Sequence, residues 1–150
     1  MAFESLSGLV GNGVLVPFRR GASDFVSGDG FEWLQSAILL ILGVRARSRL
    51  GGGELPWRSD FGSVVHLLRH RPNDAVTAEL ARVHVAEALA KWLPQVRLKD
   101  VRTDKKKDAT TGEETILLLV LRYDVAAQKN RATQVLVTDV VQEIPISLAA

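Results

Sequence analysis

Apolar residues in the first half of the chain recur every three or four positions, which is the spacing of an amphipathic helix. The first such segment predicts a helix over about residues 30–44, and Asp29 stands before it as a candidate N-cap. A second, shorter segment predicts a helix over about residues 61–71. This helix should stop there, because Pro72 disfavours a helical conformation in the residue that precedes it.

A longer helix is predicted over about residues 75–93, and Pro94 marks its end. Asn73 or Asp74 is the candidate N-cap of this helix. Its apolar residues form one stripe, whereas its charged residues lie mostly off that stripe. The stripe consists of Ala81, Val85, Ala88, Leu89 and Trp92.

Past this helix the chain becomes rich in Val, Ile, Leu and Thr, the residues that favour strands. Three segments, 95–103, 114–126 and 133–143, predict an antiparallel meander. The loop between the first two segments, residues 104–112, contains three consecutive lysines and should be solvated.

The predicted middle strand is apolar on both faces, so both faces need cover. One face should pack on the helices. The other face should be covered by the N-terminal arm or by a neighbouring subunit, since an exposed apolar sheet usually marks an interaction site. Leu117, Leu119, Leu121, Tyr123 and Val125 point to one face, and Ile116, Leu118 and Val120 point to the other.

Residues 1–28 are rich in glycine and in short apolar pairs, and they predict an irregular arm with one short strand near residues 24–26. A length of 150 residues fits a single domain with its own core. The predicted fold class is α+β: an irregular arm (1–28), about three helices (29–94) and a three-stranded antiparallel meander (95–144). The last strand is left as an open edge of the sheet.

The overall composition narrows the range of functions. A net charge of +2 does not require a nucleic-acid partner. The chain has no cysteine, which rules out disulfides and thiolate metal sites and fits assembly in a reducing cytoplasm. The start of the chain lacks a signal-peptide pattern, and the longest apolar run, residues 37–42, is far shorter than the roughly 20 residues that span a bilayer. No direct membrane insertion is expected.

His66 and His70 stand four residues apart, a spacing that places two imidazoles on one face of a helix and suits zinc. No glutamate adjoins His66 as a catalytic base, and only His84 could add a third ligand. We therefore expect no metal site and no cofactor. Arg69, His70 and Arg71 should instead meet the last carbonyl groups of their helix or an acidic partner.

Glu54 and Asp60 are a candidate pair for glycoside hydrolysis, which needs an acid and a base on either side of the bond. Each has a simpler interpretation. Asp60 can cap the helix predicted from Phe61, and Glu54 can pair with Arg58 or with an arginine at position 45, 47 or 49. A carboxylate among arginines has its pKa lowered, whereas a general acid needs a raised pKa, so no enzymatic activity is expected.

Two further segments suggest nucleotide or nucleic-acid binding. Residues 51–53 are three glycines, but the lysine and Ser/Thr of a phosphate-binding loop are missing and no strand precedes them. The lysines at 105–107 lie in a predicted hairpin loop without interleaved aromatic residues. A flexible turn and a solvated loop are the simpler interpretations, and no nucleic-acid partner is expected.

The stretch GELPWRSDFG at residues 53–62 resembles the signature of the baseplate wedge family of contractile phage tails, whose members are often labelled lysozyme-like. The family pattern is Gly-Glu, a short variable stretch, Arg, usually Pro, one residue, an aromatic residue and Gly. Leu55 stands where an arginine is common, and Ser59 stands where the proline is common. The matching positions are Gly53, Glu54, Arg58, Phe61 and Gly62.

The resemblance extends over roughly residues 11–142, in the order arm, amphipathic helix, signature, long helix and strand meander. The glycines of the arm and its Pro17-Phe18 pair fit the family. The version of the signature with Pro56 and Trp57 looks most like members from phage-tail-like injection systems. Related subunits occur in type VI secretion baseplates.

The resemblance implies a non-enzymatic structural protein, present in about six copies in a symmetric particle, that docks on other baseplate wedge proteins and initiates the sheath. It would assemble in the cytoplasm and become part of the baseplate. An open sheet edge suits this role, because a sheath strand added there gains affinity through main-chain hydrogen bonds. The expected partner-binding residues are Glu54, Pro56, Trp57, Arg58, Phe61, Gly62, Arg69 and His70, together with Thr133, Val135 and Val137 on the last strand.

Two other functions fit the same sequence. One is a lysozyme-like peptidoglycan hydrolase whose activity depends on Glu54. The other is a soluble adaptor with the same fold that binds a regulatory partner.

Overall fold

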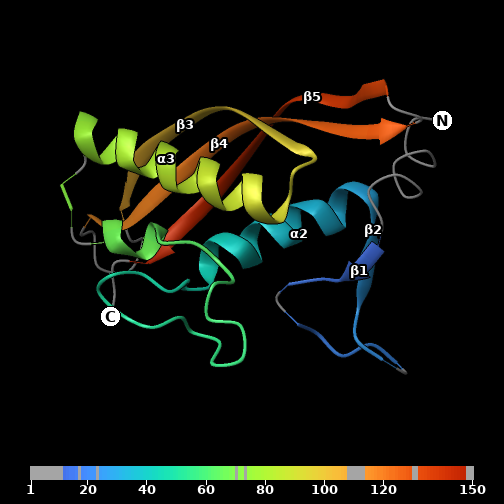
Figure 1. The fold of residues 1–150 in the computed structure, drawn as a ribbon, viewed down its shortest axis with the longest axis horizontal. Helices are drawn as coiled ribbons and strands as arrows, with labels where there is room; N and C mark the ends of the chain where they lie inside the picture. The colour runs from blue at the N-terminus through green and yellow to red at the C-terminus, as the bar shows by residue number, and fades with distance from the viewer. Residues whose placement is uncertain are drawn as a thin grey trace.

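Two α-helices pack on one face of a three-stranded antiparallel sheet, and a small hairpin lies beside the first helix (Figure 1). The computed structural model describes residues 12–16, 18–22, 24–69, 71–72, 74–107, 114–129 and 132–147. Within these ranges, the side chains at 12, 29, 105–107, 114–117, 127–129, 132–138 and 145–147 are outside the description.

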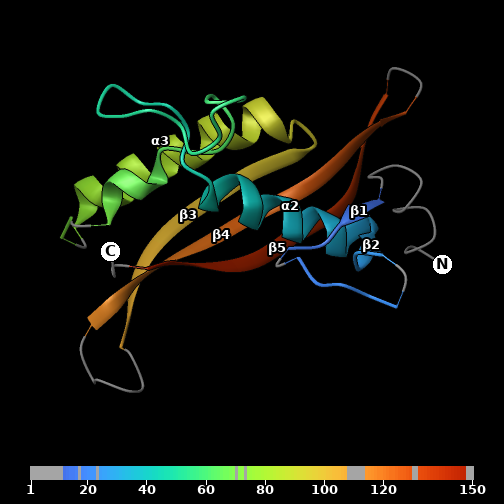
Figure 2. The same ribbon diagram turned by 90° about the horizontal axis from the view of Figure 1, so that it is seen from below.

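The three long strands follow one another in the sheet, in the order β3 (Val96–Lys107), β4 (Glu114–Lys129) and β5 (Ala132–Ser147). Each pair is antiparallel, as the sequence predicts. All three strands run further than predicted, so the lysines at 105–107 lie in β3 and not in a loop. Figure 2 shows how strongly the three strands twist and curve around the helices.

Both long helices form close to where the apolar spacing predicts them. The first, α2 (Gly30–Gly43), begins directly after Asp29, which ends strand β2 and whose side chain is outside the description. The second, α3 (Ala75–Trp92), has Asp74 as its N-cap, where the side-chain Oδ1 accepts a hydrogen bond from the Thr77 main-chain N–H at 2.8 Å. This bond lowers the pKa of Asp74. The other candidate cap, residue 73, lies outside the described residues.

The helix predicted over residues 61–71 does not form. Its place is taken by a loop and a four-residue 3-10 helix, η1 (Val65–Leu68), so the described residues contain two α-helices and not about three. Gly62 has φ +109°, a conformation that no helix contains. Ser63 then runs beside the end of α2, and its N–H donates to the Val44 carbonyl at 3.0 Å. These contacts fix the backbone in a path that a helix cannot follow.

The described part of the N-terminal arm is more regular than predicted, and residues 1–11, 17 and 23 lie outside the description. Strands β1 (Asn12–Val14) and β2 (Ser27–Asp29) pair as an antiparallel hairpin in place of one strand near residues 24–26. Gly13 lies so close to the Trp33 indole that a Cβ atom would overlap the ring, and the Ser36 hydroxyl of α2 accepts from the Val16 N–H at 2.5 Å. The described part of the arm therefore packs on α2 and not on the outer face of the sheet.

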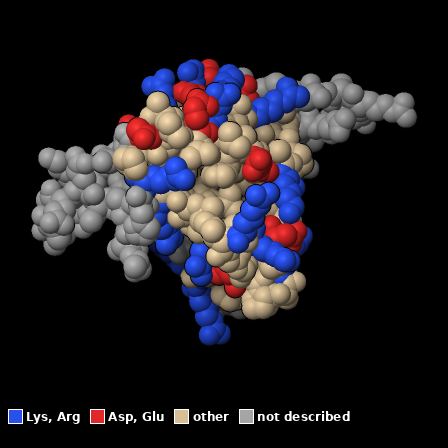
Figure 3. Space-filling view, turned by 60° about the vertical axis from the view of Figure 1, so that its left-hand side comes forward, with Lys and Arg blue, Asp and Glu red and all other residues tan. Residues whose placement is uncertain are grey.

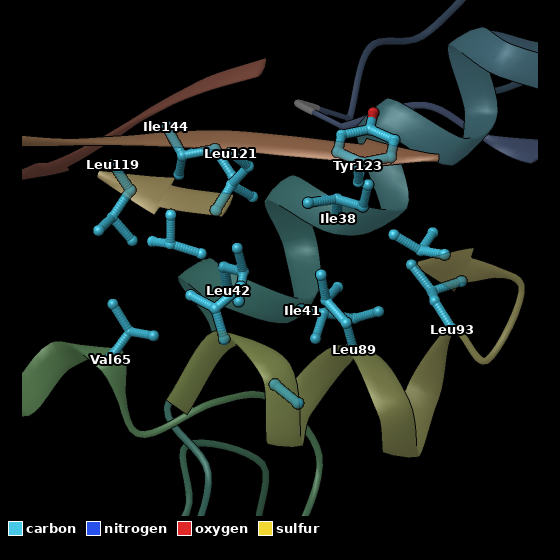
Figure 4. Packing of buried hydrophobic residues seen from close by; sticks show 14 of the residues in the cluster. Ile38, Ile41, Leu42, Val65, Leu89, Leu93, Leu119, Leu121, Tyr123 and Ile144 are labelled. Atoms are coloured by element: carbon cyan, nitrogen blue, oxygen red, sulfur yellow. The ribbon is translucent and has the colours of Figure 1, made fainter. Parts of the chain in front are cut away.

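The core lies between α2, α3 and the inner face of the sheet, which the inner residues of β4 dominate (Figure 4). Alternate residues of β4 are fully buried there, as their spacing predicts. Burying a Leu or Val side chain contributes about 1.5–3 kcal/mol, so this row anchors the helices. The fully buried residues of β4 are Leu119, Leu121, Tyr123 and Val125.

The outer face of the sheet combines apolar and charged side chains. Val120 is half-buried and Val141 is 59% exposed. Around them run ion pairs that join the three strands, including Lys99 with Asp124 and Asp139 and Arg122 with Asp139. Among the described residues no element covers this face, and its cover by a further element or molecule stays a prediction.

Candidate partner-binding loop and sheet edge

The loop between α2 and η1, residues 45–63, contains the matched signature and is called the signature loop. Its neck is closed by Glu54 and Arg45: the Glu54 N–H donates to the Arg45 carbonyl at 2.8 Å, and the Glu54 carboxylate accepts from the Arg45 N–H at 3.0 Å. The sequence predicted that Glu54 would pair with an arginine side chain. In the described part of the chain it binds the main chain of Arg45, so its role is to hold the loop closed.

The two signature glycines stand where no side chain fits. A Cβ atom on Gly53 would overlap the Ser59 carbonyl, and one on Gly62 would overlap the Val44 carbonyl. The Ser59 carbonyl also accepts from the Arg47 N–H at 2.7 Å, which draws the two sides of the loop together. The pattern of glycines in the signature thus reflects close backbone packing.

Arg58 turns towards the end of α3. Its guanidinium lies 4.8 Å from the Trp92 ring centre and 5.9 Å from that of Phe61, and the two rings meet edge to face at 5.0 Å. The Lys91 ammonium approaches the same Trp92 ring at 4.9 Å. Cations over an indole are attracted to its π-system, so this group pins the signature loop to α3.

The sequence did not predict that Lys91 and Trp92 would lie in one cluster with Arg58 and Phe61. The available signal was the position of Trp92 at the end of the helix stripe, next to a lysine. That pattern is equally typical of an ordinary core edge, so nothing in the sequence connected it to Arg58.

Asp60 lies beside Lys91 and does not cap a helix, contrary to the prediction. Its carboxylate accepts from the Lys91 ammonium at 3.0 Å, and this bond lowers the pKa of Asp60. The helix that follows is η1, whose cap residue is Val64 and has no side-chain capping bond.

Pro56 and Trp57 point into solvent at the surface of the signature loop, and Trp57 is 80% exposed. Leu50, elsewhere in the loop, is 83% exposed. Single exposed apolar side chains are common on protein surfaces, so exposure alone does not identify either residue as a contact. Glu54, Arg58 and Gly62 fix the shape of the loop, whereas Trp57 is presented outward.

Arg69 follows η1, and its buried Nε atom has no hydrogen-bond partner among the described residues. The neighbouring position, His70, was a predicted partner-binding residue and lies outside the described residues. No group of three possible metal ligands occurs in the part of the chain that the structure describes, which excludes residue 70.

Thr133, Val135 and Val137 lie on β5, opposite Gln128, Ala126 and Val125 of β4. Of the described strands, β5 pairs with β4 alone, so no described strand occupies the other side of its backbone. The sequence predicted this open edge. The side chains of the three residues are outside the description.

These features define a class of protein: a small α+β fold in which two helices cover one face of a three-stranded meander and a glycine-anchored loop packs on the end of the second helix. Residues 32–130 match the family model described as Baseplate wedge protein gp25, about two thirds of the chain. The chain belongs to this family.

Two solved structures are similar to this chain. One is the crystal structure of a Geobacter sulfurreducens protein named as a tail lysozyme, with 25% identity, a TM-score of 0.53 and coverage of 78% of this chain and 89% of that one. The other is in the anti-feeding prophage (AFP) baseplate, determined by cryo-EM with 6-fold symmetry, with 15% identity, a TM-score of 0.58 and coverage of 90% of each chain. The second likeness concerns the fold alone. Curated proteins gave no match. Among the described helices, none has the length and apolar character to cross a membrane.

Proposed function

We propose that this chain is a structural subunit of the baseplate of a contractile tail or injection system, and that β5 starts the sheath by accepting a strand from a sheath subunit. The observation that carries the proposal is the free side of β5, which is hydrogen-bonded within the chain only to β4 among the described strands. An edge strand offers unpaired N–H and C=O groups to another chain, and strand addition turns them into affinity. We further propose about six copies per particle, following the symmetry of the AFP baseplate.

The other edge of the sheet, β3, is less suited to strand addition. Its sequence carries Arg97, Lys99 and the lysines at 105–107, and charged side chains of this kind discourage edge pairing. Helix α3 also packs against β3. By contrast, residues 132–138 of β5 read ATQVLVT and contain no charge.

The chemistry of β5 also limits where a partner strand can pair. Asp139 has φ +55°, and its N–H donates to the Asp124 carboxylate at 2.9 Å, so the ladder is interrupted there. Further along, Pro145 has no N–H to donate. The candidate for strand addition is therefore the uncharged stretch with Thr133, Val135 and Val137, whose register with β4 shifts once, between Val135 and Val137.

We propose no hydrolytic activity for this chain. The Lys91 ammonium lowers the pKa of Asp60, whereas the acid of a glycoside hydrolase needs a raised pKa to hold its proton. The Glu54 carboxylate is engaged by the Arg45 main chain. Both carboxylates support the shape of the signature loop.

A proline scan over residues 133–137 tests the strand addition. In an edge strand, alternate N–H groups face the neighbouring strand and the open side, so some of these prolines should leave the melting temperature unchanged. We expect those fold-competent variants to lose binding to the cognate sheath protein in a pulldown, because each removes a donor from the open side.

Val141→Lys is the matched control, since it adds charge on β5 beyond Asp139 and keeps every N–H. It should bind sheath protein as the unchanged chain does. Full binding by every fold-competent proline variant would mean that β5 does not pair with the sheath.

A further inference from the structure

A cleft of about 600 Å³ lies between the signature loop and α3. One wall consists of residues 46–49, 60 and 62–64 from the signature loop and the residue after it. The other wall consists of residues 84, 87, 88 and 91 of α3. The lining residues that carry charge or can titrate are Arg47, Arg49, Asp60, His84, Glu87 and Lys91. The role of this cleft is not explained by the strand addition proposed above.

Buried nitrogen atoms without a hydrogen-bond partner among the described residues occur in His84, which lines the cleft, and in His66 and Arg69, which do not line it. Burial lowers the pKa of His66, and the nearby charges of Arg45, Arg69 and His84 lower it further, which favours the neutral imidazole. Buried polar nitrogens without a partner are rare in folded proteins, and the Nδ1 atom of His84 can be paired by an acceptor that enters the cleft.

The acidic groups that face the cleft do not supply that acceptor. Asp60 is bound by Lys91 at 3.0 Å, and Glu87 is exposed on the turn of α3 that follows His84. The side chains of Arg47 and Arg49 form no ion pair with other described residues. Lys and Arg are also prominent on the face that Figure 3 shows.

We propose that the cleft binds an acidic segment of a neighbouring baseplate protein, with a carboxylate of that segment directed at Arg47 and Arg49 and towards His84. Guanidinium groups bind carboxylates with strong, directional hydrogen bonds, and a partly enclosed cleft strengthens them. The proposal deepens the baseplate role and rests on it for the source of the segment.

The lining favours a peptide over a phosphate backbone. Ala46, Val64 and Ala88 provide apolar surface that can pack on the methylene groups of Glu and on an adjacent aliphatic residue. Glu87 would repel a polyphosphate or nucleic acid, which carries charge along its whole length. A segment with separated carboxylates can avoid it.

The test is an NMR titration of the isolated protein with the peptide acetyl-Glu-Leu-Glu-Leu-Glu-amide, in which the imidazole signals of His66 and His84 are followed. We expect these signals to shift saturably, and to remain unchanged with the peptide in which Gln replaces each Glu. The double variant Arg47→Gln/Arg49→Gln should raise the Kd at least about tenfold, because two charge-assisted bonds are lost.

The matched control is Arg19→Gln/Arg20→Gln, which removes two exposed arginines from the N-terminal hairpin and should leave the Kd unchanged. Glu87→Gln should lower the Kd, since it removes a repulsive charge from the cleft. The proposal is overturned by the absence of saturable shifts up to about 10 mM peptide, by equal shifts with the Gln peptide, or by an unchanged Kd in the Arg47/Arg49 variant. Since this titration needs no sheath or particle, its outcome is independent of the strand-addition test.

Discussion

Arg58 is the signature residue whose role the structure makes most specific. Its guanidinium lies over Trp92 and Phe61, although Arg58 is an exposed residue. The Glu54 carboxylate likewise accepts a hydrogen bond from the Arg45 main-chain N–H. Both residues therefore support the shape of the signature loop, on which Trp57 is exposed.

Tyr123 is the one tyrosine of the chain and a buried link between sheet and helix. Its hydroxyl donates to the Gln142 side-chain oxygen at 3.0 Å, and the Gln142 amide donates to the Gln35 carbonyl of α2 at 3.1 Å. Burial raises the pKa of Tyr123 to about 12, because the ionised phenol would lose its hydration.

This raised pKa predicts a specific alkaline response. In the unfolded chain the phenol loses its proton near its ordinary pKa of 10.0, whereas the folded chain keeps it to about pH 12. The stability that Tyr123 contributes is therefore complete below pH 10 and falls as the pH rises through that window. Tyrosinate absorbance should appear near pH 12 in the folded protein and near pH 10 in urea.

The matched variant is Tyr123→Phe, which should make the stability less dependent on pH between 10 and 12. At neutral pH it should lower the free energy of unfolding by about 1–3 kcal/mol, since the buried Gln142 oxygen loses its donor. Tyrosinate absorbance near pH 10 in the folded protein would show that the phenol is hydrated, contrary to the structure.

At the scale of elements, the signature loop is the part whose path depends most on single glycines. Gly62 turns the chain at φ +109° between the end of α2 and η1. In that conformation, and with the Val44 carbonyl in contact, any other residue is strained.

Gly62→Ala should lower the free energy of unfolding by about 1–3 kcal/mol, measured by urea denaturation with tryptophan fluorescence. Gly52→Ala is the control in the same loop, because a Cβ atom added there would meet nothing within 4 Å and the φ of Gly52 is not positive. That change should stay within about 0.5 kcal/mol. Equal effects of the two substitutions would show that the turn at Gly62 does not depend on glycine.

At the scale of the whole molecule, the three candidate binding surfaces lie on different parts of the fold. The open side of β5 lies at the edge of the sheet, the signature loop lies at the end of α3, and the cleft runs between this loop and the helix. The inner face of the sheet packs against the two helices in the hydrophobic core. Under the proposed function, the loop would hold a neighbour while the sheet edge accepts a sheath strand.

If the signature loop docks on a partner, substitutions within the matched signature should reduce particle assembly, whereas a substitution elsewhere in the loop should not. Trp57→Ala, Glu54→Ala and Arg58→Ala should each reduce the yield of sheathed particles, counted by electron microscopy, while the circular dichroism spectrum stays native. Leu50→Ala is the control, because Leu50 is as exposed as Trp57 but lies outside the matched signature. A normal yield from all three variants would refute the docking role.

Several elements of the fold could be predicted because their signals are local. The stripe of α3, the alternation along β4 and the Asp74 cap each follow from residues a few positions apart. The helix predicted over residues 61–71 was wrong for the opposite reason. Its apolar spacing was suitable, but the pairing of Ser63 with the distant Arg45 and the turn at Gly62 prevented it.

The sequence by itself determined the two long helices, the three-stranded meander with its open edge and the family, because periodicity, caps and a contiguous motif are all written along the chain. Only the tertiary structure decided how the signature acts. Arg58 meets Trp92, and Arg47 faces His84 across a cleft, only after folding brings distant segments together. Contacts between such segments depend on the packing of the whole core, which no local pattern of residues records.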